Sequence, residues 1–224
     1  MKDIAIVGHG GLAREIAFLI GEINRATPTW NLLGYIASDA GSLSRTVGRH
    51  VVWGTDESLL KSTKETAVAI AIGQPSRLRS LHERFRQNPK LSFPNLIHPS
   101  VTGDWERIAM DSGNIVLNNA SFTTDIKLGA LNIINPGVTI AHDCVLGSYN
   151  LINPGASLSG EVVLADEILV GTGARVLQQL HVCSRAVIGA GAVVTRSIKK
   201  PGVYIGIPAR ERNAAHSETD GERQ

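Results

Sequence analysis

Aromatic residues are scarce in this chain: three Trp, three Tyr and four Phe make up only 4% of its 224 residues. So few rings, together with 23 glycines and many small or branched aliphatic residues, suit a fold of narrow, repetitive layers rather than a bulky sandwich core. An excess of charge of one sign is lacking too, because 22 Lys and Arg balance 20 Asp and Glu. This balance, without any basic run, gives no electrostatic footprint for a nucleic acid.

Long hydrophobic runs and clustered cysteines are also missing. No stretch approaches the ~18 apolar residues that span a bilayer, and the apolar run near the N-terminus is too short for a signal peptide. The two cysteines, Cys144 and Cys183, do not have the spacing of metal ligands. They could form one disulfide in an exported protein, but without an export signal free buried thiols are the favoured interpretation. We therefore expect a cytoplasmic protein.

The first 95 residues predict a Rossmann-like α/β domain. Apolar runs that end in turn residues predict strands, and apolar residues at helical spacing predict helices. Thr55 is the expected N-cap of one helix, and Pro75 lies in the first turn of another. The basic face of that last helix is interpreted as solvated. The predicted strands cover residues 3–8, 31–38 and 67–73, and the predicted helices cover residues 12–25, 55–62 and 75–88.

After residue 95 the period changes to six. Twelve branched aliphatic residues recur at this interval. A period of six fits neither a helix nor an isolated strand, but it fits a solenoid in which three sextets close one triangular coil. Successive coils would stack at ~4.8 Å, with the repeated residues inside. We assign residues 96–210 to this domain and the polar residues 211–224 to a disordered tail. The repeated residues are Leu128, Ile134, Ile140, Leu146, Ile152, Leu158, Leu164, Val170, Val176, Val182, Ile188 and Val194.

Seven motifs carry a resemblance to a known family. They are IVGHGGLAREIA, LLGYI, AIAIG, FPNLIHPS, INPGVTIAHDC, GAGAVVT and KPGVYIGIPAR, in that order. The chain resembles the hexapeptide-repeat sugar O-acyltransferase (sialic acid O-acetyltransferase) family over residues 2 to 210. That family includes N-acetyltransferases of nucleotide-linked 4-amino sugars. The resemblance implies a left-handed parallel β-helix, a homotrimer, acetyl-CoA as co-substrate and no metal. The hand rests on the resemblance alone, because right-handed crossovers are the general rule.

His142 and Asp143 are adjacent within the sextets. A neutral imidazole near pH 7 can take a proton from an acceptor amine or hydroxyl, and a neighbouring carboxylate can fix its tautomer. Neighbours on a straight strand point to opposite faces, so the pair can cooperate only at or near a corner of the coil. From the pattern alone, a catalytic base and a solvated corner histidine are equally open. The resemblance implies that His142 is the general base and that Asp143 raises its basicity.

The resemblance also implies the remaining positions of an acetyl-transfer site. Asn135 matches a family position close to the catalytic site, and Gly160, Thr172 and Ala190 match acetyl-CoA-binding positions in the groove between adjacent β-helices. The N–H of Gly160 would steady the thioester oxygen as charge develops there. One position departs from relatives that act on uridine-linked sugars, because Leu151 stands where they carry a second histidine.

The glycine loop of residues 8–13 fits G-x-G-x-x-A between a strand and a helix, a pattern that brings a helix N-terminus to a phosphate. NAD binding is disfavoured, because the half-chain is too small and the expected acid is misplaced. The resemblance implies instead that Gly8, His9, Gly10 and Gly11 hold the diphosphate of a nucleotide sugar. Where the family reads the nucleoside with paired aspartates, this chain has Ala37 and Ser38, followed by Asp39. That leaves guanosine, deoxythymidine or a nucleotide-free sugar open.

These observations predict acetyl-CoA-dependent N-acetylation of an amino sugar, which is expected to be nucleotide-linked, in surface polysaccharide synthesis. A sugar O-acetyltransferase with the same base is the nearest alternative. A γ-class carbonic anhydrase would need metal ligands, and His98, His142 and His181 lack the clustered spacing. A scaffolding solenoid without catalysis is the last alternative.

Overall fold

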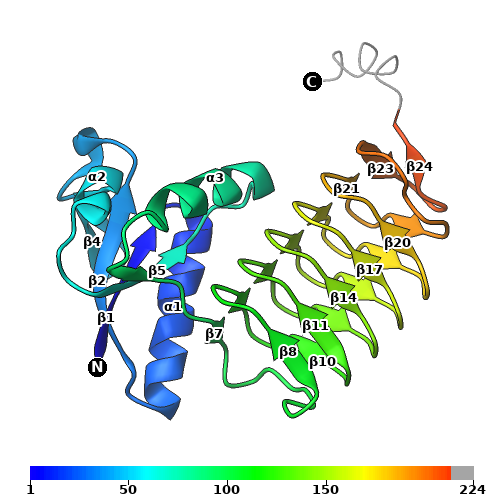
Figure 1. The fold of residues 1–224 in the computed structure, drawn as a ribbon, viewed down its shortest axis with the longest axis horizontal. Coiled ribbons are helices and arrows are strands. Elements are labelled where there is room, and N and C mark those ends of the chain that lie inside the picture. Colours follow the sequence, from blue (N-terminus) through cyan, green and yellow to red (C-terminus); the bar gives the residue numbers. More distant parts are fainter. Residues whose placement is uncertain (213–224) are drawn as a thin grey trace.

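The computed structural model describes residues 1–212, which form an α/β domain followed by a long coil of short strands. Figure 1 shows the two parts side by side, with the coil extending away from the first domain. Residues 213–224, most of the predicted tail, lie outside the described residues.

The N-terminal domain contains a six-stranded sheet in the order β3-β4-β2-β1-β5-β6. Every pairing is parallel except that of β3 with β4, which form an antiparallel hairpin. This hairpin and β6 were not among the predicted strands. The elements are β1 (Lys2–Val7), α1 (Gly11–Ala26), β2 (Trp30–Ala37), η1 (Ala40–Ser42), β3 (Thr46–Val47), β4 (His50–Thr55), α2 (Asp56–Leu60), β5 (Thr66–Ile70), α3 (Pro75–Phe85) and β6 (Leu91–Ser92).

The helix starts follow local sequence signals. Thr55 caps α2 in a capping box with Ser58, and Pro75 is the first residue of α3, where its missing N–H costs nothing. The helix α1 begins after Gly10, which offers no side-chain cap. The N–H groups of its first turn are therefore free to bind an external acceptor.

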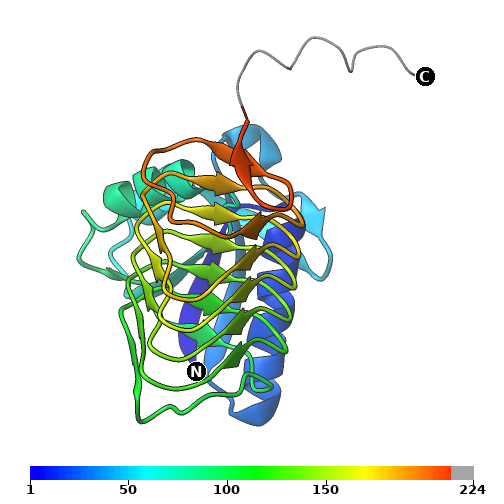
Figure 2. The same cartoon turned by 90° about the vertical axis from the view of Figure 1, so that its right-hand side faces the viewer.

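The second part is a left-handed parallel β-helix with three flat faces, and Figure 2 shows its stacked coils. The strands of each face pair in parallel with the strands one coil before and after, except β24, which pairs antiparallel with β23. The first face contains β7 (Leu96–Ile97), β9 (Ile115–Val116), β12 (Ile133–Ile134), β15 (Leu151–Ile152), β18 (Leu169–Val170), β21 (Val187–Ile188), β23 (Val203–Ile205) and β24 (Arg210–Glu211). The second face contains β10 (Ser121–Phe122), β13 (Thr139–Ile140), β16 (Ser157–Leu158), β19 (Arg175–Val176) and β22 (Val193–Val194). The third face contains β8 (Ile108–Met110), β11 (Ile126–Leu128), β14 (Val145–Leu146), β17 (Val163–Leu164) and β20 (His181–Val182).

The period of six places its residues as predicted. All twelve repeated aliphatic residues are buried, with at most 4% of any of them exposed. Asn132 and Asn150 are buried polar residues and form part of an internal ladder at the corner between the third and first faces. The side-chain oxygen of Asn132 accepts from the N–H of Asn150, and that of Asn150 accepts from the N–H of Ile168. These bonds satisfy backbone groups that would otherwise be buried without partners.

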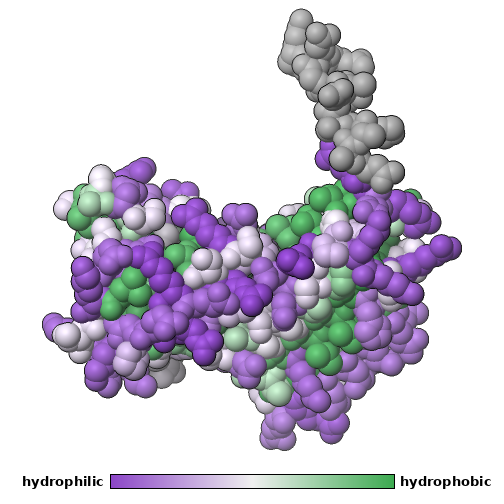
Figure 3. All heavy atoms as spheres, turned by 45° about the horizontal axis from the view of Figure 1, so that its top comes forward, coloured by the Kyte–Doolittle hydropathy of each residue, from purple (hydrophilic) through white to green (hydrophobic). Residues whose placement is uncertain are grey.

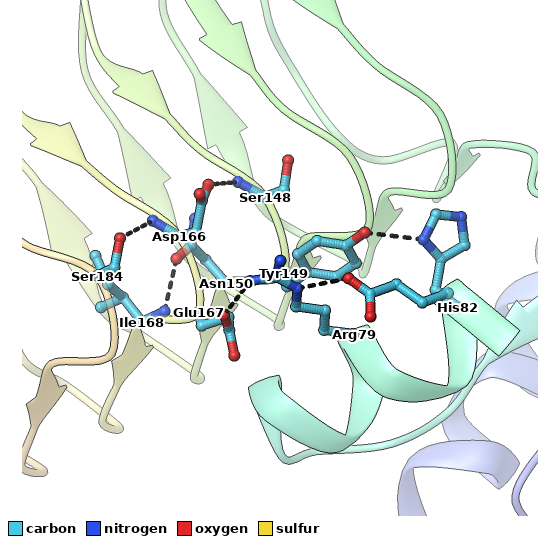
Figure 4. Close-up of polar contacts among 10 residues, drawn as sticks. Arg79, His82, Ser148, Tyr149, Asn150, Asp166, Glu167, Ile168 and Ser184 are labelled. Carbon is cyan, nitrogen blue, oxygen red and sulfur yellow. Dashed lines mark hydrogen bonds and ion pairs between the residues drawn. The ribbon is translucent and has the colours of Figure 1, made fainter.

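The N-terminal domain packs against the first face of the β-helix. Ile133 and Leu151 belong to the same buried cluster as the core of the α/β domain. Figure 4 shows the polar contacts beside this interface: Nδ1 of His82 lies 2.9 Å from the Tyr149 hydroxyl, and Arg79 on α3 forms an ion pair with Glu167. Both contacts join α3 to the coil, so they fix the position of this helix.

Part of the first face lies beyond the cover of the N-terminal domain. Its outward-pointing residues remain apolar there, and Val203 and Ile205 are 39% and 43% exposed. Figure 3 shows apolar surface on this side of the β-helix. Glu211, which the sequence analysis assigned to the tail, lies in β24 and pairs with Lys200, and the N–H of Arg212 donates to Val203. Glu211 and Arg212 therefore contact the end of the β-helix.

Candidate active site

His142 and Asp143 lie at the corner between the second and third faces, after β13 and before β14. Asp143 has φ of 60°, the left-handed conformation that turns the chain at this corner. Nδ1 of His142 lies 2.8 Å from Oδ2 of Asp143, although the residues are neighbours in sequence. The side chains are 56% and 55% exposed, so the imidazole projects outward rather than into the core. The corner therefore meets the geometric condition for cooperation.

The Asp143 contact fixes the role of each ring nitrogen. A carboxylate only accepts hydrogen bonds. Nδ1 of a neutral His142 therefore carries the proton and donates a hydrogen bond to Asp143. Nε2 is then left with a free lone pair. A neutral imidazole held in this tautomer is suited to act as a general base.

Gly160 lies one coil above His142, at the same corner. A Cβ added at this glycine would lie 2.6 Å from Cε1 and 2.7 Å from Nε2 of His142. The missing side chain therefore leaves the backbone open beside the basic nitrogen. Within residues 1–212 the N–H of Gly160 donates to no backbone or side-chain acceptor, as expected for a corner residue. These two features suit a group that stabilises charge on a reacting oxygen.

Asn135, Thr172 and Ala190 lie elsewhere, at the corner between the first and second faces. Asn135 is 6% exposed, and its amide donates to the Ile152 carbonyl at 3.1 Å. Thr172 and Ala190 occupy equivalent positions in successive coils, and the N–H of Gly191 donates to the carbonyl of Thr172. Within one chain the second face separates these three residues from His142 and Gly160.

A cavity of about 460 Å³ opens beside the histidine corner. Asp143 lines it together with Arg107, Asp125 and Lys127. Arg107 forms an ion pair of 2.6 Å with Asp125, and this hydrogen-bonded guanidinium lowers the pKa of the Asp125 carboxyl. No sequence motif predicts this pair, because Arg107 and Asp125 are one coil apart.

A second cavity, of about 430 Å³, lies at the carboxyl ends of the strands in the N-terminal domain. Four predicted residues line it: Gly8, His9, Gly10 and Ser38. Ligands of open α/β sheets bind at this edge, because the loops and helix N-termini converge there. The structure therefore brings most of the predicted sugar-binding residues to one site.

Two other predicted residues do not line this cavity. Gly11 is the first residue of α1. Asp39 instead caps η1, where its Oδ1 accepts from the N–H of Ser42 at 3.1 Å. Residues that the sequence analysis missed complete the lining, notably Asp56 on α2 and Arg77 on α3. Asp56 could have been identified from the sequence, because it is a polar residue directly after a parallel strand.

The described residues 1–212 contain no cluster of three or more His, Cys, Asp or Glu side chains that could hold a metal ion. Cys144 and Cys183 are both free, the first buried and the second half-buried. Among the same residues, no helix has the length and apolar character needed to cross a membrane.

Comparisons with known proteins agree with this architecture. Residues 3–85 match the sequence model of the PglD N-terminal domain. A comparison with curated proteins gives no match. PerB from Caulobacter crescentus, solved with CoA and GDP-perosamine, is 27% identical with a TM-score of 0.84, covering 95% of this chain and 98% of its own. The acetyltransferase domain of PglB from Neisseria gonorrhoeae FA1090 is 28% identical with a TM-score of 0.85, covering 95% and 100%.

A third structure, WeeI from Acinetobacter baumannii AYE, shares the fold with a TM-score of 0.82 at 24% identity, covering 95% of this chain and all of its own. The acetyltransferase domain of PglB was also solved with acetyl coenzyme A. The resemblance drawn from the sequence motifs is confirmed by these comparisons.

Proposed function

We propose that this relative of the sugar N-acetyltransferases transfers an acetyl group from acetyl-CoA to the amine of a nucleotide-linked amino sugar in the cytoplasm, for surface polysaccharide synthesis. The single observation that carries the proposal is the outward-facing His142, held by Asp143 and opposed by the bare backbone of Gly160. This arrangement supplies a base and a hydrogen-bond donor at one point of the surface, as acyl transfer needs.

Each residue of this corner has a distinct role. Nε2 of His142 accepts a proton from the acceptor amine as its nitrogen bonds to the thioester carbonyl carbon. Asp143 stabilises the imidazolium that results. The N–H of Gly160 donates to the carbonyl oxygen while that oxygen carries negative charge. Acetyl-CoA supplies the acetyl group as a thioester. The carbon–sulfur bond breaks, the imidazolium returns its proton to the sulfur, and CoA leaves as the free thiol.

A complete site requires more than one copy of the chain. His142 and Gly160 lie at one end of the second face, whereas Asn135, Thr172 and Ala190 lie at the other end. Adjacent β-helices of a trimer would bring the histidine corner of one subunit to the Asn135 corner of the next. The exposed apolar surface on the first face is further support for contact between copies, since such surface marks protein interfaces.

The N-terminal cavity is the proposed site for the nucleotide sugar. Its glycine loop and the N-termini of α1 and α3 suit a diphosphate, because their N–H groups have no side-chain caps. Arg77 adds a positive charge to the lining. The N-terminal domain packs on the first face, away from His142. We infer that one subunit presents the sugar to the histidine of another.

Acetyl transfer tests the proposal directly. Purified protein is incubated with acetyl-CoA and UDP-, GDP- or dTDP-linked amino sugars, and CoA release is followed with a thiol reagent. We expect one of these sugars to be acetylated, and His142→Ala to lower kcat by ~10²–10⁴-fold without loss of the folded oligomer. Unaltered turnover in this variant would remove the histidine from the mechanism.

Product analysis separates the proposal from O-acetylation. An amide product resists mild alkaline hydrolysis, whereas a sugar ester does not. Mass spectrometry before and after such treatment therefore identifies the acceptor group. An ester product would mean that the same corner acts on a hydroxyl.

A further inference from the structure

We propose that Asp56 recognises the nucleoside of the bound nucleotide sugar, by accepting a pair of hydrogen bonds from its ribose hydroxyls or from the edge of its base. This inference rests on the proposed function and deepens it. It assigns nucleoside recognition to the end of β4 rather than to the end of β2, where the sequence analysis placed it.

The buried state of Asp56 is the first observation. Only 9% of its side chain is exposed, yet the residue lines the N-terminal cavity. Its Oδ2 lies 3.4 Å from Nη1 of Arg84, a long contact, and Arg84 bonds more closely to Glu57. No hydrogen bond to Oδ1 is formed anywhere in residues 1–212.

A largely buried carboxylate with one long ion-pair contact gains from further partners. In keeping with this, burial raises the pKa of Asp56, against the opposing effect of Arg84 and Arg77. Oδ1 of Asp56 is not among the buried atoms that lack a hydrogen-bond partner, so a ligand in the cavity can reach it. A ligand that donates hydrogen bonds to the free oxygen would supply the missing partners. Buried, perturbed carboxylates in cavities are for this reason candidates for functional groups.

The register of the sheet gives the second observation. Strands β2 and β4 are parallel neighbours in which Ala37 pairs with Thr55. Ser38 and Asp56 directly follow the ends of these two strands, and both line the cavity. Parallel strands lie ~4.8 Å apart, so Asp56 places a carboxylate one strand away from Ser38, at the same level.

The residue after Ser38 does not provide a carboxylate to the cavity. Asp39 is held by the N–H of Ser42 in the cap of η1. Among the residues that line the cavity, Asp56 is the one acid. Any carboxylate recognition of a nucleotide in this cavity therefore falls to Asp56.

The ligand chemistry follows from the charge. A carboxylate repels a diphosphate and accepts from paired donors, such as the 2′- and 3′-hydroxyls of ribose or the N1–H and N2–H of guanine. The glycine loop and Arg77 are the diphosphate side of the same cavity. Asp56 is therefore assigned to the nucleoside end of the ligand.

Calorimetric titration of the full-length protein tests this assignment. The ligands are GDP, 2′-deoxy-GDP, IDP, UDP and dTDP, each in the presence of CoA. The variants are Asp56→Asn and Asp56→Ser, both checked by melting temperature. Glu57→Gln is the matched control, because it removes the neighbouring carboxylate on α2 that shares Arg84 but does not line the cavity.

We expect Asp56→Asn and Asp56→Ser to weaken the binding of the preferred nucleotide by ~10–100-fold, the range for a hydrogen bond to a charged group. Glu57→Gln should leave it unchanged. If the wild type discriminates against 2′-deoxy-GDP and the variants do not, the partner is the ribose. If the discrimination that disappears is against IDP, the partner is the base.

Three results separate the possible failures. Equal affinity of wild type and Asp56 variants for a nucleotide that binds would overturn the role of Asp56 and leave the proposed function intact. An equal loss in Glu57→Gln would also overturn it, because the effect would then act through Arg84. Wild-type protein that binds none of the five nucleotides would refute the nucleotide-linked substrate itself, and the role of Asp56 with it.

Discussion

Gly160→Ala is the substitution that most directly tests the geometry of the histidine corner. The added Cβ would lie 2.6 Å from Cε1 of His142, whereas ordinary contact begins at about 3.4 Å. The ring must therefore retreat by about 0.8 Å, the difference between these two distances. Gly160 is not among the residues with positive φ, so alanine fits the backbone without strain.

The expected effect is on catalysis rather than on stability. The ring is more than half exposed and can turn toward solvent, so the melting temperature should be unchanged. A misplacement of ~1 Å in a catalytic group costs ~10²-fold in rate. We therefore expect kcat to fall by ~10²-fold, equivalent to ~2.7 kcal/mol in the activation free energy. The assay is CoA release at saturating substrate.

Two controls isolate the cause. Gly21→Ala places a Cβ on α1 where it meets nothing within 4 Å, so it should leave kcat unchanged and stabilise the helix by ~0.5–1 kcal/mol. In a His142→Ala background, Gly160→Ala should have little further effect, because the ring that it displaces is gone. Wild-type turnover in Gly160→Ala would refute the assigned position of the imidazole.

Three further predictions concern the N-terminal domain and its interface. Burial lowers the pKa of His82 below its ordinary value of about 6.5. The unfolded chain therefore binds a proton at His82 more readily than the folded chain does. The free energy of unfolding should decrease as the pH falls below about 6.5. Urea denaturation from about pH 8 to about pH 5 should show a smaller decrease in His82→Gln. Leu151→Ala removes a buried side chain from the core that joins the two domains. It should lower the free energy of unfolding by ~2–5 kcal/mol, measured by chemical denaturation. Leu151→Met, which nearly keeps the volume, should lower it by less than ~1.5 kcal/mol. Gly8→Ala forces a non-glycine residue to φ of 103°, with its Cβ 3.0 Å from the Ala71 carbonyl oxygen. The resulting ~1–3 kcal/mol of strain in the glycine loop should weaken nucleotide binding in the calorimetric titration. An unchanged Kd would remove the glycine loop from the binding site.

Leu151 illustrates how one residue is explained only by its surroundings. In the sequence it is an apolar residue at the position where, by the family resemblance, relatives acting on uridine-linked sugars carry a histidine. In the structure it is 7% exposed and lies in the core shared with the N-terminal domain, close to the position of Gly73. A residue on the first face is remote from the corner of His142, so in one chain the two positions do not share a site.

The sequence by itself determined the coil. A branched aliphatic residue at every sixth position can be buried by one arrangement of short strands and turns, and each of the twelve is buried. It also determined the starts of α2 and α3, because Thr55 and Pro75 act through local hydrogen bonding and a fixed φ. Such signals depend on residues a few positions apart, so they can be read without coordinates.

Only the tertiary structure decided which residues share a site. The left-handed turn at Asp143 joins two neighbours that a straight strand would separate. The parallel register of β2 and β4 brings Asp56 level with Ser38, while the cap of η1 occupies Asp39. The triangular coil divides the predicted acetyl-transfer residues between two corners. These outcomes depend on strand order and coil stacking, which bring distant residues together or keep nearby ones apart, and no local pattern in the sequence encodes those distances.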